Sequence, residues 1–153
     1  MKENFSTLPA DTTSILRILA KSFKSISEHS IKSSKTSGLN PSEFAVMEVL
    51  YLDGPQKIQQ IGANLLLVSS GNVTYILDKL EKNQLVVREH SKVDRRAIFA
   101  KLTKLGVEFM DNHYPQYELI FKEVFSILTF EEQEQLKNTL QKVRTHSEQL
   151  LRR

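Results

Sequence analysis

The sequence contains no cysteine and only five glycines among its 153 residues. Without cysteine there is no disulfide framework, no thiolate metal site and no thiol redox switch. The glycines do not fall into the spacing of a phosphate-binding loop or a nucleophile elbow, and no ordered pair of acids suggests catalysis. We therefore expect a protein that is not an enzyme and that needs no cofactor.

Long apolar runs are also missing. No run is long enough to span a bilayer, and residues 1–6 lack the apolar core of a signal peptide. Apolar residues make up 40% and charged residues 25% of the chain, as in ordinary globular domains. The net charge of +3 permits a polyanionic partner without requiring one. We expect a single cytoplasmic domain over residues 1–153 that has no membrane partner.

The four histidines offer no metal site in the sequence. No two of them stand four residues apart, and none forms a close cluster with acids. The nearest approach to a cluster is His113 with Glu108 and Asp111. Solvated or helix-capping histidines are the simpler interpretation, so we expect no bound metal.

A helical segment over residues 68–82 carries the strongest functional pattern. Val73, Ile76, Leu77 and Leu80 recur at the spacing of one helix face. The opposite face consists mainly of short hydrogen-bonding groups, which suit base edges and phosphates in a DNA groove. Its residues are Ser70, Asn72, Thr74, Tyr75, Asp78 and Lys79. Taken alone, this face could equally be the solvated side of a core helix.

The segments on both sides of residues 68–82 favour a DNA-binding role for this helix. A short helix expected over about residues 57–67 precedes the segment across a tight turn, which predicts a helix-turn-helix. Two extended segments follow, at 85–90 and 97–102, joined by a basic stretch. We interpret them as a β-hairpin wing whose Arg95 and Arg96 enter a minor groove. The alternative for these arginines is a solvated charge pair.

The remaining segments predict helices. Apolar spacing predicts a long helix over about 11–33, a deeply buried helix over 40–52 and another helix from about 103 to 128. Pro115 predicts a kink or local irregularity in the third of these. A capping box of Thr129 and Glu132 predicts the start of a last helix. The narrow apolar stripes of the first and last helices suit packing on a second protomer.

The chain resembles the multiple-antibiotic-resistance-regulator (MarR) family of winged-helix transcription factors. The residues that carry the resemblance are 39–44, 60–62, 73–81, 85–88, Asp94-Arg-Arg96 and Leu102-Thr-Lys-Leu-Gly106. It implies a mainly α fold with a small β-hairpin wing and a homodimer built from the N- and C-terminal helices. The winged helix-turn-helix then covers 38–106, and the dimerisation helices cover 8–35 and 107–153.

The resemblance also implies which residues meet double-stranded DNA at a pseudo-palindromic operator. The predicted DNA-binding residues are Ser69, Ser70, Asn72, Thr74, Tyr75, Lys79, Arg88, Arg95 and Arg96. Asp94 matches the acid that holds the wing arginines in place, so its predicted role is structural. Further basic candidates for phosphate contact are Lys57, Lys82 and Lys92.

A ligand-responsive repressor is the function that the resemblance favours, with a small aromatic, phenolic or quinone-like effector. A crevice between the dimerisation helices and the winged helix would be lined by Phe23, His29, Phe44, Met47, Met110, His113 and Tyr114. Aromatic and methionine side chains at this spacing are also typical of plain core. The alternatives are a helical protein-interaction module and a regulator without a small-molecule ligand.

Overall fold

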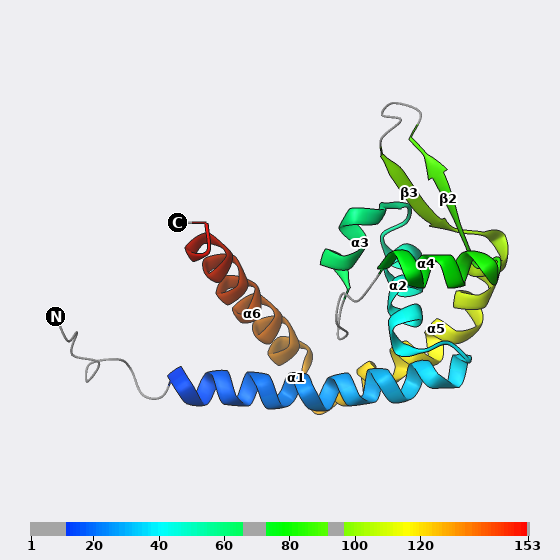
Figure 1. The fold of residues 1–153 in the computed structure, drawn as a ribbon. Coiled ribbons are helices and arrows are strands. Elements are labelled where there is room, and N and C mark those ends of the chain that lie inside the picture. The colour runs from blue at the N-terminus through cyan, green and yellow to red at the C-terminus, as the bar shows by residue number, and fades with distance from the viewer. Residues whose placement is uncertain (1–11, 66–72, 92–96, 153) are drawn as a thin grey trace. The chain divides into compact units, whose positions relative to one another are not determined.

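The computed structural model describes residues 12–65, 73–91 and 97–152, which form a mainly helical fold with one small sheet (Figure 1). The elements are α1 (Thr12–Ser34), the 3₁₀ turn η2 (Lys35–Ser37), α2 (Pro41–Leu52), β1 (Gln56–Lys57), α3 (Ile58–Asn64), α4 (Val73–Lys82), β2 (Val86–His90), β3 (Ile98–Leu102), α5 (Lys104–Phe125) and α6 (Phe130–Leu150). This architecture confirms the predicted fold class. Among the described residues, no helix has the length and apolar character needed to cross a membrane.

The chain divides into two compact units, Met1–Tyr117 and Glu118–Arg153. The core of the first unit is built around α2, which has buried residues at every position from 43 to 50. Asn40 and Glu43 form a capping box at the start of this helix, and Pro41 occupies its first turn. The side chains of Val46 and Met47 are completely buried. The continuous apolar pattern of α2 therefore marks the centre of this unit.

The sheet is antiparallel, with strand order β1-β3-β2. In the two long strands Val86 pairs with Leu102 and His90 with Ile98, which confirms the predicted hairpin pairing. Strand β1 was not predicted, because a two-residue strand shows no periodicity. The prediction of a helix over 57–67 was too long: Lys57 belongs to β1, and the backbone of Leu65 is extended.

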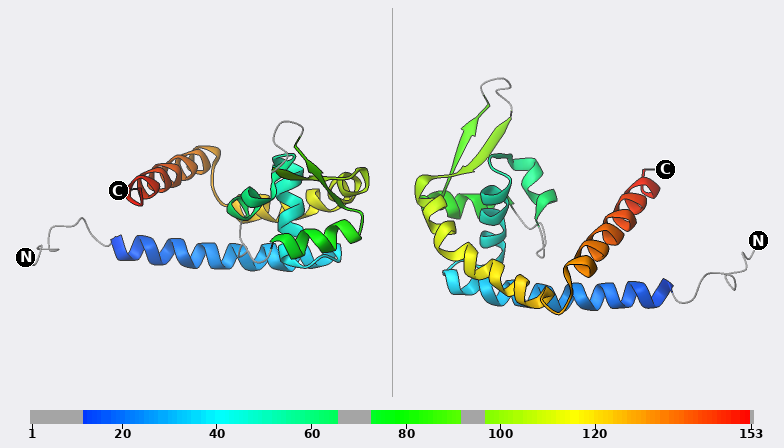
Figure 2. Two further views of the ribbon diagram at one scale, coloured as in Figure 1. Left: turned by 45° about the horizontal axis from the view of Figure 1, so that its top comes forward. Right: turned by 180° about the vertical axis from the view of Figure 1, so that it is seen from behind.

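A compact junction turns the chain from α4 into the sheet (Figures 1 and 2). The backbone N–H of Leu85 bonds to Leu80 and that of Gln84 to Glu81, while Gln84 adopts the left-handed conformation with φ of 60°. This is the Schellman helix end. The Thr103 hydroxyl donates to the Gln84 carbonyl at 2.6 Å and accepts the N–H of Gly106 at 3.0 Å.

Gly106 allows the start of α5 to touch this junction. A Cβ atom at this position would lie 2.0 Å from the carbonyl oxygen of Leu85. Because that neighbour is backbone, a larger residue would force α5 away from the start of the wing. The Leu-Thr-x-x-Gly pattern therefore has a packing reason: Thr103 caps α5, and Gly106 lets α5 approach the sheet.

The helix α5 continues through Pro115, so this proline does not divide it. In the second unit, the predicted capping box of α6 is present, with Glu132 Oε2 accepting the N–H of Thr129 at 2.8 Å. The amide of Gln133 donates to the carbonyls of Phe125 and Leu128, at 3.2 and 3.1 Å. These bonds fix the turn between the end of α5 and the start of α6.

A buried polar cluster joins three helices of the first unit. The Tyr117 hydroxyl of α5 lies 2.8 Å from Ser30 Oγ of α1 and donates to Glu48 Oε2 of α2 at 3.4 Å. Burial raises the pKa of Glu48 from 4.5 to about 7, and the Tyr117 hydrogen bond offsets only part of that rise. The folded protein therefore keeps this carboxyl group protonated at mildly acidic pH, where an ordinary glutamate is ionised.

We predict that Glu48 makes the protein less stable as pH rises. Between pH 4.5 and about 7 the folded state binds this proton more tightly than the unfolded state, so stability is lost across that window. The loss should be roughly 2–4 kcal/mol and then level off. Urea unfolding of wild type and Glu48→Gln at fixed protein concentration measures it.

The free energy of unfolding of wild type should fall relative to that of Glu48→Gln as pH rises. Glu108→Gln, at an exposed position on α5, is the control and should leave the wild-type profile unchanged. A constant difference between wild type and Glu48→Gln from pH 4.5 to 8 would show that Glu48 titrates normally.

Candidate nucleic-acid interface

The helix α4 has one buried face and one exposed face. Ile76, Leu77 and Leu80 are buried, as their spacing predicts. Thr74 and Tyr75 are exposed, Tyr75 with 56% of its surface accessible. The helix is therefore anchored by its apolar stripe and presents hydroxyl groups to solvent, which is the arrangement a groove-reading helix needs.

Lys79 is held on the exposed face by two neighbours. Its ammonium lies 3.5 Å from Glu43 Oε1 and 5.0 Å from the centre of the Tyr75 ring. The other oxygen of Glu43 accepts the N–H of Asn40 at 3.1 Å, so the carboxylate that caps α2 also restrains Lys79. The Lys79 side chain is still 46% exposed. It therefore remains accessible to a phosphate oxygen.

Arg88, which was predicted to bind DNA, forms contacts within the protein. Its side chain is 23% exposed and forms ion pairs with Asp78 and Glu81 of α4. The guanidinium is thus engaged within the protein. Sequence reasoning missed both acids as its partners, although the seven-residue separation of Glu81 and Arg88 across a helix end places them within reach.

Several predicted residues lie outside the part of the chain that the structure describes. They are Ser69, Ser70, Asn72, Lys92, Asp94, Arg95 and Arg96. The strands that flank the basic stretch are described, and Ser91 N–H bonds to the Ala97 carbonyl at 2.9 Å just beyond their ends. The roles of these residues in DNA binding stay predictions.

The predicted crevice residues fall into three groups by exposure. Phe44, Met47 and Met110 are buried in the core. Phe23 and His29 are exposed on α1. His113 and Tyr114 are half-buried, and His113 Nδ1 lies 2.8 Å from the Phe109 carbonyl. The helical spacing could not separate these groups, because it gives the face of a residue and not the neighbour that covers it.

Sequence reasoning missed a set of aromatic contacts beside the core methionines. Tyr117 lies with ring centres 4.7 Å from Phe44 and 5.9 Å from Tyr114, and Tyr51 lies 5.4 Å from Tyr114. The Tyr51 hydroxyl also donates to Asp111 at 2.7 Å. The i, i+3 spacing of Tyr114 and Tyr117 was the available signal. Within residues 12–65, 73–91 and 97–152, no group of His, Asp and Glu could hold a metal ion.

A short helix, a second helix with an exposed polar face and an antiparallel hairpin define a winged helix-turn-helix protein of the DNA-binding class. The family model described as "MarR family" matches residues 39–98. The chain is 53% identical over 137 residues to the protein named "Uncharacterized HTH-type transcriptional regulator YkoM" of Bacillus subtilis (strain 168), covering 90% of this chain and 88% of that one. The chain belongs to the MarR family of transcriptional regulators.

Other comparisons agree with this assignment. The HTH-type transcriptional regulator MhqR of Bacillus subtilis (strain 168) is 39% identical over 86% of this chain and 90% of its own. The fold matches AbsC of Streptomyces coelicolor, a MarR family regulator, with a TM-score of 0.77 and 20% identity over 92% of this chain and 97% of that one. It also matches NadR in complex with 4-hydroxyphenylacetate, with a TM-score of 0.68 and 18% identity over 92% and 96% of the two chains.

We predict that Lys79→Ala weakens specific and nonspecific DNA binding alike. Loss of one phosphate contact should reduce the slope of log affinity against log salt by about 0.9. Titration of labelled duplexes at several salt concentrations measures this slope. Lys142→Ala, at an exposed position of α6, removes the same charge and should leave the slope unchanged. A changed base preference with an unchanged slope would mean that Lys79 contacts bases.

Proposed function

We propose that the protein is a homodimeric repressor that inserts α4 into the major groove of a pseudo-palindromic operator. The observation that carries this proposal is the exposed face of α4, where Thr74, Tyr75 and Lys79 stand opposite a largely buried apolar stripe. Threonine and tyrosine hydroxyls can meet base edges or phosphates, and the lysine can meet a phosphate. In this proposal Arg95 enters the adjacent minor groove, and Asp94 holds the wing arginines.

Exposed apolar side chains on α1 support the homodimer. The first half of this helix has no buried residue, although it carries a continuous apolar stripe. The stripe comprises Ile15, Leu16, Ile18, Leu19 and Phe23, each 41–65% exposed. Such a surface is costly in water and is typical of an interface. A second copy of the chain, which carries the same stripes, is the occupant we propose.

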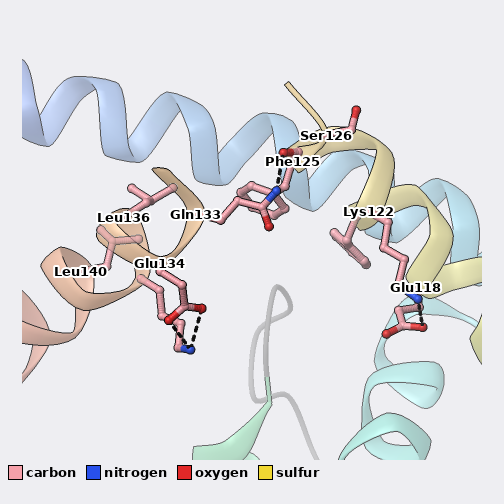
Figure 3. Close-up of a pocket in the computed structure, with 10 residues that line it drawn as sticks. Glu118, Lys122, Phe125, Ser126, Gln133, Glu134, Leu136 and Leu140 are labelled. Atoms are coloured by element: carbon pink, nitrogen blue, oxygen red, sulfur yellow. Dashed lines mark hydrogen bonds and ion pairs between the residues drawn. The ribbon is translucent and has the colours of Figure 1, made fainter. Parts of the chain in front are cut away.

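A groove in the second unit supports the same conclusion. It has a volume of about 700 Å³, and Phe121, Phe125, Leu136 and Leu140 contribute apolar walls (Figure 3). Lys122 pairs with Glu118 and Lys137 with Glu134 at its margins. The helix α6 itself has no buried residue. An isolated helix of this kind depends on packing for its stability, which a partner protomer would supply.

We predict a dimer at micromolar concentration in sedimentation equilibrium. Leu140→Lys places a charge in the apolar groove and should raise the dimer dissociation constant by tenfold or more, on the order of the cost of burying an unpaired charge. Gln141→Lys, the next residue on the same exposed helix, adds the same charge outside the groove and should leave the dimer intact. A wild-type monomer at these concentrations would contradict the proposed assembly.

The operator should contain two inverted half-sites. A two-fold dimer places both recognition helices on one face of the duplex, so half-site centres should lie roughly 10 base pairs apart. Selection of bound duplexes from a random pool, followed by footprinting, tests this arrangement. A single unrepeated half-site would rule out symmetric binding. Failure to enrich any duplex at modest salt would favour the protein-interaction module.

A small aromatic, phenolic or quinone-like effector completes the proposed function. Its support is the aromatic cluster of Phe44, Tyr51, Tyr114 and Tyr117, which joins α2 to α5 next to the buried carboxyl of Glu48. The fold it shares with NadR accommodates 4-hydroxyphenylacetate in that protein. Repeating the duplex-binding assay with small aromatic compounds tests this part, and release of DNA is the result expected of a ligand-responsive repressor.

A further inference from the structure

Arg88 reaches from the first strand of the wing back to the helix proposed to read DNA. Its Nη1 lies 2.7 Å from Asp78 Oδ1 and 3.3 Å from Glu81 Oε2, and its Nη2 donates to the carbonyl of Thr74 at 2.9 Å. The three partners stand at i, i+4 and i+7 of α4, which places them along one side of the helix. One side chain of β2 therefore contacts about two turns of α4.

Glu81 fixes the backbone of Arg88 as well as its side chain. While Oε2 accepts from the guanidinium, Oε1 accepts the backbone N–H of Arg88 at 3.2 Å. A carboxylate that binds both groups restrains the position of the strand and the direction of the side chain together. The end of α4 and the start of β2 are thus joined by more than the covalent turn between them.

The charge of Arg88 is already balanced. Two carboxylates face one guanidinium, and Nε is buried without a hydrogen-bond partner in the described structure. A phosphate that binds this guanidinium would have to compete with partners that lie 2.7 to 3.3 Å from its nitrogen atoms. The Lys79 side chain, by contrast, remains 46% exposed, and its ammonium pairs with the carboxylate of Glu43.

We propose that Arg88 is a positioning residue that clamps the recognition helix α4 to the wing strand β2 and does not itself contact DNA. This inference rests on the proposed role of α4 as the helix that reads DNA. If the clamp is broken, α4 and the wing lose their fixed relative orientation, and both must regain it on the operator. Specific binding then weakens more than nonspecific binding, because nonspecific contacts tolerate a less defined geometry.

Replacement of the two acids tests the role of Arg88, because the two possible roles predict opposite changes in affinity for the operator. Asp78→Asn with Glu81→Gln makes the protein more positive and frees the guanidinium. If Arg88 clamps α4, this double variant should lose about tenfold or more in affinity for the selected operator. If Arg88 contacts phosphate, the same variant should bind more tightly. Glu89→Gln is the control and should cause no loss. It removes an exposed acid next to Arg88 on β2, which pairs with Lys101 of β3.

Two substitutions of Arg88 complete the experiment. Arg88→Lys keeps the charge but carries all its donors on one nitrogen, which cannot reach acceptors spread along α4 as the two Nη atoms of the guanidinium do. It should therefore bind specific DNA as weakly as Arg88→Gln. Neither should change the salt slope by the ~0.9 of a lost phosphate contact. Combining Arg88→Gln with the acid double variant should cause little further loss, because all these changes break one clamp.

Different results would contradict the proposed role of Arg88 and the proposed function of the protein. Tighter operator binding by the acid double variant, or full rescue by Arg88→Lys together with a reduced slope in Arg88→Gln, would assign Arg88 to DNA. Absence of binding to any duplex by the wild-type protein would instead refute the proposed function. Thermal unfolding of each variant identifies those that are folded at the assay temperature. The acid variants alter partly exposed side chains, so they test the clamp even if Arg88→Gln fails to fold.

Discussion

Burial of one face of α4 determines which of its side chains can meet DNA. Leu77 and Leu80 are completely buried, and each contributes about 1.5–3 kcal/mol by leaving water. Rotation of the helix about its axis would expose them, so this energy fixes Thr74 and Tyr75 on the outer side. The Schellman end at Gln84 and the close approach of Gly106 to Leu85 then fix where the wing begins. The geometry of the interface thus depends first on apolar packing.

Ion pairs add to apolar packing in holding α4 against its neighbours. Glu43 links the start of α2 to Lys79, and Arg88 links β2 to α4. Both interactions join an element of the core to the helix proposed to read DNA. They differ in what they leave available, because Lys79 remains accessible while Arg88 is enclosed by acids. Two basic side chains that are similar in the sequence therefore have different functions in our account.

Sequence periodicity predicted the helices, the hairpin and the buried stripe of α4, because each depends on local spacing. It could not predict β1, which is too short to show a pattern, or the partners of Arg88, which depend on the turn after α4. It also grouped Phe44 with Phe23 as crevice residues, although one is buried in the core and the other is exposed on α1. Whether such a residue is buried depends on neighbours from distant parts of the chain, which the spacing of apolar residues does not show.

The absence of cysteine from the sequence makes a direct test of α4 straightforward. Lys82→Cys, at the exposed end of α4, accepts an iron chelate that cleaves nearby DNA, and Lys142→Cys on α6 is the control. We predict two symmetric clusters of cleavage on the selected operator from the label at position 82 and none from the label at position 142. Cleavage from position 142 alone would show that α4 is not the helix that meets DNA.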